Sequence, residues 1–473
     1  MDVIAAVAAG GGGPSAIGVV RVSGPGCFSV CGRVFRAGNG KAFEELEPRK
    51  MVLGEMLDRE GRVLDRGLAV RFPGPRSYTG EDSAEFHCHG SPVVLRELLA
   101  ALFAAGAVSG TPARQAGPGE FTKRAFLNGR LDLTQAEAVV DLIDAETAAA
   151  ARNAAAQLDG GLRRRLEPVQ EALLDITSRF YAVVDYPDED IEDVRPEEAA
   201  AALREADRSL TALLDGCRRG QVLKRGVRTA IVGLPNAGKS SLLNALAGYD
   251  RCLVTDVPGT TRDTVEESVL CGGVLLRLID TAGLRETEDQ VERLGVERSR
   301  RAMETADLIL LVEDGAVEPD AIDEDIAEEL DLQEAVVLTG KPWIYIASKR
   351  DLSGILKTAV GSLDGRVRPA ACVSLSAVTG EGMEELEQAV AALFPPGTPE
   401  EAGSLLTDQR QEEAAGRARE AVRRARAALE EGMTPDAVLT DAEEALEAIG
   451  ELTGRTAREE IVSRIFSRFC VGK

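Results

Sequence analysis

The sequence contains few of the residues that mark metal centres and extracellular folds. Its 473 residues include two histidines, one tryptophan and eight cysteines, and no two cysteines form a C-x-x-C pair. Neither a disulfide framework nor a zinc ribbon is therefore indicated. No apolar run approaches the ~18 residues that span a bilayer, and the N-terminus has no basic start ahead of its glycines. We therefore expect a cytoplasmic protein without a secretory signal or a membrane contact.

Basic residues are also scarce. The chain has 55 Lys and Arg against 79 Asp and Glu, which gives a net charge of −24. This balance argues against RNA binding over the whole surface, because phosphate contacts need a concentrated positive field. Any RNA partner must dock on a local patch, and two groups of arginines could form one or could equally be solvated helix faces. They are residues 163–165 and Arg417, Arg419, Arg423, Arg424 and Arg426.

Four segments differ in composition and pattern along the chain. The first is rich in glycine and proline, with strand-like runs at 16–22 and 67–72, and predicts an α+β domain. The second is alanine-rich and opens with Thr134 and Glu137 spaced as a capping box, which predicts helices. Its apolar stripe is Val169, Leu173, Ile176 and Phe180. That stripe has the spacing of a packed helix face.

The third segment alternates β-rich runs with helical ones, and the fourth is helical again. Such alternation is typical of a mostly parallel, doubly wound α/β sheet. The β-rich runs are 229–232, 275–279, 308–312 and 343–346. We place the four segments at residues 1–130, 131–225, 226–395 and 396–473. This order predicts an α/β unit inserted between the two halves of one helical domain.

The strongest chemical signal is the pattern G-x-x-x-x-G-K-S at residues 233–240, which follows a strand-like run and precedes a helical one. Its glycines let backbone N–H groups approach phosphate, Lys239 carries charge to the β- and γ-phosphates, and the Ser240 hydroxyl can ligate Mg²⁺. The loop therefore predicts a nucleoside triphosphate site. The nucleotide contacts expected here are Asn236, Ala237, Gly238, Lys239, Ser240 and Ser241.

Two further segments fit the same site. The D-T-A-G at 280–283 can hold the magnesium shell and respond to the γ-phosphate. The polar loop at 254–263 would on its own be an ordinary connection, but its place between two phosphate motifs favours Thr261 as a second Mg²⁺ ligand. The nucleotide contacts expected in these segments are Thr255, Thr260, Thr261, Asp280, Thr281, Ala282 and Gly283.

A base-recognition segment follows at Ser348, Lys349, Arg350 and Asp351, and it is similar to the N-K-x-D of guanine-binding GTPases. Asp351 is placed to accept hydrogen bonds from guanine. Ser348 replaces the usual asparagine, and its short hydroxyl cannot make the same bridges as a carboxamide, which predicts weaker guanine affinity. The base contacts expected are Ser348, Lys349, Asp351, Ser376 and Ala377.

The combined motifs resemble the MnmE (TrmE) family of tRNA-modification GTPases over nearly the whole chain. Outside the GTPase motifs, the resemblance is carried by residues 18–24 (GVVRVSG), 77–90, 118–135 and 469–473. It implies an N-terminal folate-binding and dimerisation domain, a discontinuous helical domain and an inserted Ras-like G domain. It also implies a homodimer that works on tRNA with an FAD-dependent, MnmG-like partner in a heterotetramer or larger complex. The implied activity installs an aminomethyl or carboxymethylaminomethyl group at carbon 5 of the wobble uridine.

The resemblance further implies roles for single residues. Leu284 stands where Ras-like proteins carry a water-orienting glutamine, and the family's glutamate for that task falls on Glu292. Potassium would replace an arginine finger, held by Asn236 and by backbone oxygens of Thr255, Val257 and Thr260. A 5-formyltetrahydrofolate or related folate would be contacted by Arg21, Glu85, Arg130 and Lys473. Judged on their sequence context alone, Arg21 and Glu85 would more often be solvent-facing residues.

Three residues and two rival functions are left open by the sequence. Cys470 is either a buried small apolar group or a reactive thiol, so it is a possible catalytic thiol. His87 and His89 share one face of a predicted strand, but no third metal ligand is suggested. One rival function is a GTP-dependent binding module for ribosome assembly, which would use the same GTPase motifs without modifying a base. The other is a folate-dependent methyltransferase that merely carries a G domain.

Overall fold

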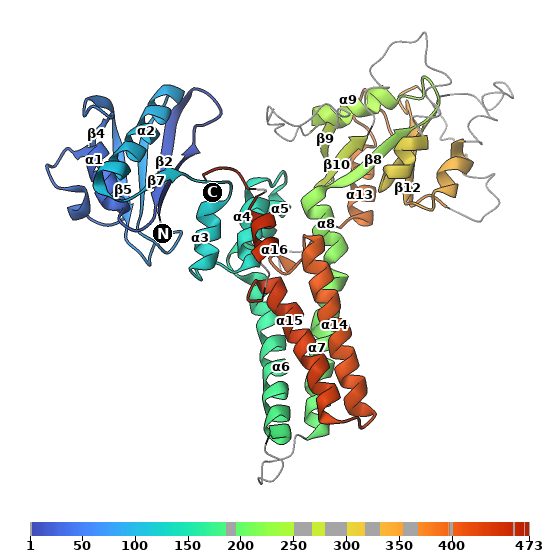
Figure 1. Ribbon diagram of the computed structural model, residues 1–473. Helices are drawn as coiled ribbons and strands as arrows, with labels where there is room; N and C mark the ends of the chain where they lie inside the picture. The colour runs from blue at the N-terminus through green and yellow to red at the C-terminus, as the bar shows by residue number, and fades with distance from the viewer. Residues whose placement is uncertain are drawn as a thin grey trace. The chain divides into compact units, whose positions relative to one another are not determined.

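The computed structural model divides into two compact units, each described by itself (Figure 1). The described residues are 2–185, 195–249, 267–279, 300–316, 332–352, 368–395, 397, 401–456, 459–467 and 469–472. The first unit comprises Met1–Val140, Leu158–Arg204 and Arg417–Lys473. The second comprises Asp141–Gln157 and Glu205–Gly416. Four helices cross these limits, namely α4 (Leu133–Ile143), α5 (Ala148–Leu158), α7 (Pro196–Asp215) and α14 (Gln409–Glu430).

The first unit begins with a seven-stranded sheet in the order β3-β4-β5-β6-β2-β1-β7. All neighbouring strands are antiparallel except β1 and β7, which are parallel. The strands are β1 (Val3–Ala9), β2 (Ser15–Ser23), β3 (Phe35–Ala37), β4 (Val52–Leu57), β5 (Val63–Phe72), β6 (Ser83–Gly90) and β7 (Ala113–Gln115). Helices α1 (Cys27–Val34) and α2 (Pro92–Ser109) and a short 3-10 turn at Phe43–Glu45 complete the core. The α+β fold predicted for this part is confirmed.

Helix α2 is long and apolar, although the sequence has no uninterrupted apolar run of membrane-spanning length. By length and composition it is apolar enough to cross a membrane, and it is the one such helix among the described residues. Two charged residues, Arg96 and Glu97, interrupt its apolar run and hid it from the sequence analysis. Its buried side chains, including Leu95, Leu98 and Leu102, belong to the core cluster of the N-terminal sheet. The apolar face of α2 is thus part of a domain core.

The helical part of the first unit is built on α6 (Gly161–Asp185) and α15 (Pro435–Thr453), which lie side by side (Figure 1). The stripe predicted from Val169 to Phe180 is buried at all four positions. Short helices α3 (Glu120–Leu127) and α16 (Glu459–Phe466) contact each other nearby. The packed helix face expected from the periodicity is therefore confirmed.

The capping box predicted at the start of α4 was placed two residues late. The Asp132 carboxylate accepts a hydrogen bond from the backbone N–H of Gln135 at 2.8 Å, and the Gln135 side chain accepts one from the backbone N–H of Asp132 at 3.0 Å. Thr134 lies inside the first turn and donates its hydroxyl to Asp132 at 2.6 Å. Asp132 and Gln135 thus form the reciprocal cap, because an aspartate caps as well as a threonine.

The second unit contains a six-stranded sheet in the order β13-β12-β11-β8-β10-β9. Only the pair β9 and β10 is antiparallel. The strands are β8 (Val227–Val232), β9 (Glu267–Cys271), β10 (Val274–Ile279), β11 (Leu308–Asp314), β12 (Trp343–Ser348) and β13 (Ala371–Ser374). Helices include α5 (Ala148–Leu158), α8 (Cys217–Arg225), α9 (Lys239–Tyr249) and α13 (Met383–Leu393).

Continuous apolar runs explain why this sheet is covered on both faces. Along β11, Leu308, Leu310 and Val312 pack into one core cluster, whereas Ile309 and Leu311 pack into another. Since successive side chains of a strand point to opposite faces, the two clusters lie on opposite faces of the sheet. The doubly wound α/β fold predicted for this segment is confirmed.

Candidate functional site

The phosphate loop connects β8 to α9. Three of its residues have a positive φ, namely Gly233 (159°), Asn236 (62°) and Gly238 (97°). A Cβ on Gly233 would lie 2.1 Å from the Val312 carbonyl oxygen of β11, so only glycine fits there. The turn leads into α9 at Lys239, which places Ser240 and Ser241 in its first turn, where free N–H groups attract anions.

Lys239 turns back over this loop. Its Nζ donates hydrogen bonds to the carbonyl oxygens of Gly233 at 2.8 Å and Leu234 at 2.6 Å. Burial lowers the pKa of Lys239, because desolvation disfavours its charged form. Both carbonyl oxygens are uncharged, so an arriving phosphate would offer the ammonium a stronger, charged acceptor.

The base-recognition segment lies beside the phosphate loop. The Ser348 hydroxyl donates to the Ala237 carbonyl at 2.6 Å, and Lys349 Nζ binds the Asp314 carboxylate at 2.5 Å. Because β8, β11 and β12 are parallel, their carboxyl ends meet at one edge of the sheet, where ligands of such sheets bind. Ser348 thus makes one bridge to the phosphate loop despite its short side chain. Asp314 was not singled out from the sequence, since it lies in no motif.

The other predicted base contacts lie near the same edge of the sheet. Ser376 is buried, and its hydroxyl accepts hydrogen bonds from the backbone N–H groups of Val378 at 3.3 Å and Thr379 at 3.2 Å. Ala377 follows it in the same loop, after β13. Asp351 is exposed beyond the end of β12, so its carboxylate is accessible to a ligand.

Ten predicted site residues lie outside the described residues, so the structure does not place them. They are Thr255, Val257, Thr260, Thr261, Asp280, Thr281, Ala282, Gly283, Glu292 and Lys473. The predicted Mg²⁺ and K⁺ ligands are therefore placed only at Ser240 and Asn236.

A second cluster of candidate functional residues lies in the N-terminal domain. Arg21 of β2 and Glu85 of β6 are register partners, and Arg21 Nε lies 2.9 Å from Glu85 Oε1. Both side chains are 20% exposed. The Arg21 guanidinium lies over the rings of Tyr78 at 5.4 Å and Phe121 at 5.8 Å. These distances are within cation–π range, so the two rings hold the guanidinium in place.

Three neighbours of this pair were missed by the sequence analysis of the folate site. Tyr78 and Phe121 lie in the sequence blocks that carry the family resemblance, and that location was the only available signal. Burial raises the pKa of Tyr78, so its hydroxyl stays protonated and shares a 2.9 Å hydrogen bond with Thr122. His87 Nε2 lies 3.5 Å from Glu85 and has no hydrogen-bond partner among the described residues.

The remaining N-terminal candidates lie near α3. Arg130 is exposed after α3, and its Cγ would be 3.2 Å from a Cβ on Gly80. Cys470 is exposed, so the alternative of a buried apolar thiol is wrong. The backbone carbonyl of Cys470 accepts a hydrogen bond from the N–H of Gly119 at 3.3 Å. His89 binds the Asp65 carboxylate through Nδ1 at 2.9 Å.

Part of the predicted RNA patch is neutralised by carboxylates of α15. Arg417 pairs with Glu451 at 2.5 Å, and Arg424 pairs with Asp441 at 2.8 Å. Arg424 also contacts Glu444 at 2.5 Å. The positive charge of α14 is thus offset locally, which favours the solvated, ion-paired helix face over an RNA patch for these two arginines.

Two family models match the chain. The model described as the GTP-binding protein TrmE N-terminus matches residues 3–130, and the model described as the MnmE helical domain matches residues 133–470. Together they extend over both described units.

Curated relatives match over their full length. A protein of Heliobacterium modesticaldum is 42% identical over 481 residues, covering 100% of this chain and 99% of its own. A protein of Akkermansia muciniphila is 43% identical over 464 residues, covering 98% of this chain and 97% of its own. Both are named tRNA modification GTPase MnmE. The solved G domain of the T. maritima FeoB iron transporter is 28% identical, with a TM-score of 0.25, covering 35% of this chain and 97% of that one.

Proposed function

The chain belongs to the MnmE (TrmE) family of tRNA modification GTPases, and we propose that it couples GTP hydrolysis to modification of carbon 5 of the wobble uridine. With an FAD-dependent, MnmG-like partner it would install an aminomethyl or carboxymethylaminomethyl group there. One observation carries the proposal, namely that the chain combines two separate features. The first is a phosphate loop that is hydrogen-bonded to a base-recognition segment. The second is an Arg–Glu pair whose guanidinium lies over two aromatic rings. A GTPase that only switches a binding surface has no need for the second feature.

In the G domain, Lys239 would hold the β- and γ-phosphates against the N-terminus of α9, and Asp351 would select guanine. Lys239 fits this role because its ammonium donates to two carbonyl oxygens that a phosphate can replace. Ser348 and Lys349 would hold the base segment in register with the phosphate loop. These residues bind and orient the nucleotide.

Two ions and one carboxylate would complete the hydrolytic site. Bound Mg²⁺ and K⁺ would neutralise charge that develops as the γ-phosphoryl group transfers. Glu292 would orient the attacking water in place of the glutamine that Leu284 replaces. Ser240 and Thr261 would hold Mg²⁺, and Asn236 with backbone oxygens of Thr255, Val257 and Thr260 would hold K⁺.

In the N-terminal domain, the Arg21–Glu85 pair would hold a tetrahydrofolate that supplies or accepts the one-carbon unit. The residues fit a pterin, because a carboxylate accepts hydrogen bonds from its amide and amine edge. His87 Nε2, which lies beside Glu85 and has no hydrogen-bond partner within the part of the chain that the structure describes, offers one more polar contact to such a ligand. Arg130 and Lys473 would contact its anionic parts, and Cys470 is accessible for a chemical role.

The proposed assembly is a homodimer joined through the N-terminal domains, which binds the FAD-dependent partner and tRNA. GTP hydrolysis would act as a conformational step, since a phosphate site and a base-modifying site need different groups. Lys239 and Arg21 belong to different compact units, which is consistent with this separation of roles.

The function is tested by mass spectrometry of wobble nucleosides in tRNA from cells that lack the gene. We expect the carbon-5 modification to be lost, restored by the wild-type chain, and not restored by Lys239→Ala. Unchanged nucleosides in the deletion strain would overturn the proposal. The ribosome-assembly module would then be the better explanation of the GTPase motifs.

The folate site is tested by titrating 5-formyltetrahydrofolate onto the purified full chain. Arg21→Gln should weaken binding about tenfold or more, because a charge-assisted hydrogen bond and its ring contacts are lost. Arg36→Gln is the matched control, since Arg36 also pairs across strands of this sheet with a glutamate, Glu55, at 3.2 Å. Equal affinity in the two variants would contradict a folate role for Arg21.

A further inference from the structure

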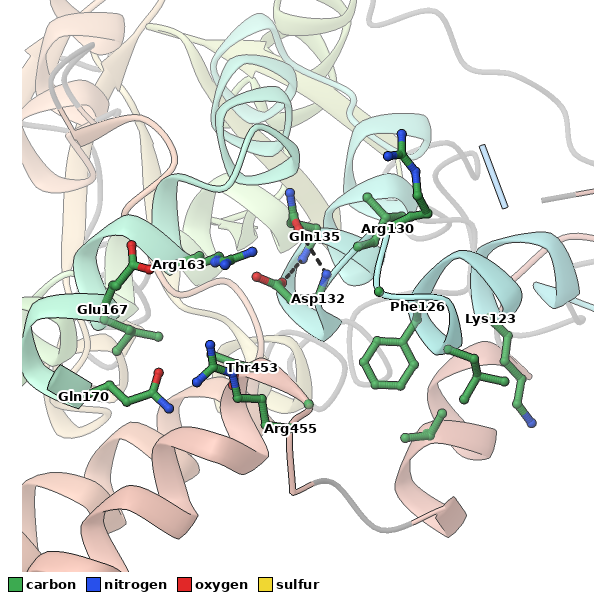
Figure 2. Close-up of a pocket in the computed structure, with 16 residues that line it drawn as sticks. Lys123, Phe126, Arg130, Asp132, Gln135, Arg163, Glu167, Gln170, Thr453 and Arg455 are labelled. Carbon is green, nitrogen blue, oxygen red and sulfur yellow. Dashed lines mark hydrogen bonds between the residues drawn. The ribbon is translucent and has the colours of Figure 1, made fainter. Parts of the chain in front are cut away.

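One pocket of the first unit adjoins the proposed folate site, with which it shares Arg130, and its other lining residues have no role so far. It has a volume of about 770 Å³ and is enclosed by the end of α3 and the loop after it, by α6 and by the end of α15 (Figure 2). Its size is within the range of sites for small organic ligands. The side chains used below are Phe126, Arg130, Asp132, Arg163, Gln170 and Arg455.

The pocket collects arginines that lack a carboxylate partner. Arg130, Arg163 and Arg455 form no side-chain hydrogen bond or ion pair within the part of the chain that the structure describes, whereas Arg417 and Arg424 on α14 are paired with acidic residues. Figure 2 shows the guanidinium groups of Arg163 and Arg455 gathered near Asp132 and Gln170. The lining carries four cationic side chains against two carboxylates, namely Lys123, Arg130, Arg163 and Arg455 against Asp132 and Glu167. In a chain with a net charge of −24, this excess of cations around one pocket indicates an anionic ligand.

The uncharged groups of the pocket suit a planar base. The half-buried ring of Phe126 lines it and is supported from behind by Phe466, with ring centroids 6.2 Å apart. Bases of unpaired RNA stack on such rings. The amide of Gln170 carries a donor and an acceptor, which together match the imide edge of uracil. Cations for phosphate and a flat apolar surface for a base are the combination that a nucleotide requires.

The wall of the pocket is connected to the Arg21–Glu85 cluster. Asn128, in the loop between Phe126 and Arg130, donates a 2.7 Å hydrogen bond to the carbonyl oxygen of Thr79. Thr79 follows Tyr78, whose ring contacts the Arg21 guanidinium. A nucleotide in the pocket would thus be held by a segment that also shapes the proposed folate site.

We propose that this pocket binds one unstacked nucleotide of the tRNA anticodon loop together with its flanking phosphates. The proposal rests on the proposed function, since it names where that substrate is held. Arg163 and Arg455 contact phosphate, Phe126 stacks on the base and Gln170 reads its edge. These are binding and positioning roles, with no part in GTP hydrolysis.

Binding of a fluorescent anticodon stem-loop with a wobble uridine to the purified full chain tests this pocket. Arg163→Gln and Arg455→Gln should each weaken RNA binding about tenfold, while GTP hydrolysis and 5-formyltetrahydrofolate binding stay at wild-type values. Arg165→Gln is the matched control, because Arg165 is exposed on the same helix but does not line the pocket. It should leave RNA affinity unchanged.

A second measurement uses the unaltered protein. RNA with 4-thiouridine at the wobble position should cross-link, on irradiation, to peptides containing Phe126 or Gln170. Cross-links confined to other peptides, or equal RNA affinity for Arg163→Gln and Arg165→Gln, would overturn the proposal. A loss of folate binding without a loss of RNA binding would also overturn it and assign the arginines to the anionic tail of the folate.

The outcome for the pocket is distinguishable from the outcome for the proposed function. If the wild-type gene restores the wobble nucleoside and Arg163→Gln does so equally well with unchanged RNA affinity, only the pocket is wrong. If the wild type has no effect on the nucleoside, the proposed function fails whatever the RNA affinity of the variants.

Discussion

Ser348 occupies the position at which guanine-binding GTPases usually carry asparagine. On sequence grounds this replacement predicts weaker guanine binding, because a hydroxyl has fewer hydrogen-bonding groups than a carboxamide. The structure shows that the hydroxyl reaches the Ala237 carbonyl of the phosphate loop at 2.6 Å. Sequence could identify the position but not this contact, since it joins residues 111 positions apart.

Ser348→Ala should therefore weaken GDP and GTP binding about tenfold. The substitution removes the donor to a buried carbonyl, and an unsatisfied buried acceptor costs roughly 1–3 kcal/mol. Titration of a fluorescent guanine nucleotide measures the effect. Ser348→Asn is the control, because its amide can donate to the same carbonyl. An alanine variant with wild-type affinity would show that this hydrogen bond does not shape the site.

Alkylation of single cysteines tests whether their thiols are buried as the structure shows. Burial, with a smaller contribution from Asp65, raises the pKa of Cys88 to about 11, and burial with Glu387 raises that of Cys271 to about 12. Thiolate is the reactive form, and it increases as pH rises toward the pKa, so neither thiol should react with iodoacetamide at pH 8. Exposed Cys470 should react.

Peptide mass spectrometry of the folded chain after timed alkylation reads each cysteine separately. Cys88 should become labelled only as the pH approaches 11, provided that the fold persists, which circular dichroism checks. Rapid labelling of Cys88 at pH 8 would contradict the burial seen here.

The proposed folate-binding residues show which contacts between residues cannot be predicted from sequence spacing. Arg21 and Glu85 were named from the family resemblance, and they meet although they are 64 residues apart. Tyr78 and Phe121 complete their surroundings, but no local spacing connects either ring with Arg21. Contacts of this kind depend on strand register and on the packing of α3, which appear only in three dimensions.

Helix faces were easier to predict than helix ends at the scale of elements. The stripe on α6 follows from periodicity alone, because residues three and four apart share a face. The start of α4 was misplaced because both Asp132 and Thr134 can cap a helix. Which one does so depends on the reciprocal bonds with Gln135, and sequence does not decide between two adequate caps.

Packing rather than surface charge should stabilise the helices α6, α14 and α15 of the first unit. Leu173→Ala should destabilise the helical part by about 2–5 kcal/mol, since Leu173 is fully buried. Arg424→Ala removes only partly exposed ion pairs with α15, so its cost should be under about 1 kcal/mol. Hydrogen exchange resolved to α6 peptides measures both variants. A larger effect from Arg424→Ala would show that the ion pairs dominate.

At the scale of the whole molecule, the net charge of −24 limits how the chain can hold RNA. On sequence alone, eight arginines could form one RNA-binding patch, because a sequence shows charges but not their ion-pair partners. The structure pairs Arg417 and Arg424 with acidic residues of α15 and leaves Arg163 at the pocket without one among the described residues. Only a few arginine side chains should therefore contact tRNA phosphates.

The number of arginines that contact phosphate determines how strongly RNA binding depends on salt. For single-stranded RNA the slope of log affinity against log salt is about −0.7 for each phosphate neutralised. Contacts from Arg163 and Arg455 alone predict a slope of about −1.4, whereas all eight arginines of the two sequence groups together would give roughly −6. Anticodon stem-loop titrations between low and moderate salt, at constant K⁺ and Mg²⁺, measure the slope for the full chain. A value near −6 would mean that the α14 arginines exchange their carboxylate partners for phosphate, and that the pocket alone does not determine how this acidic protein binds tRNA.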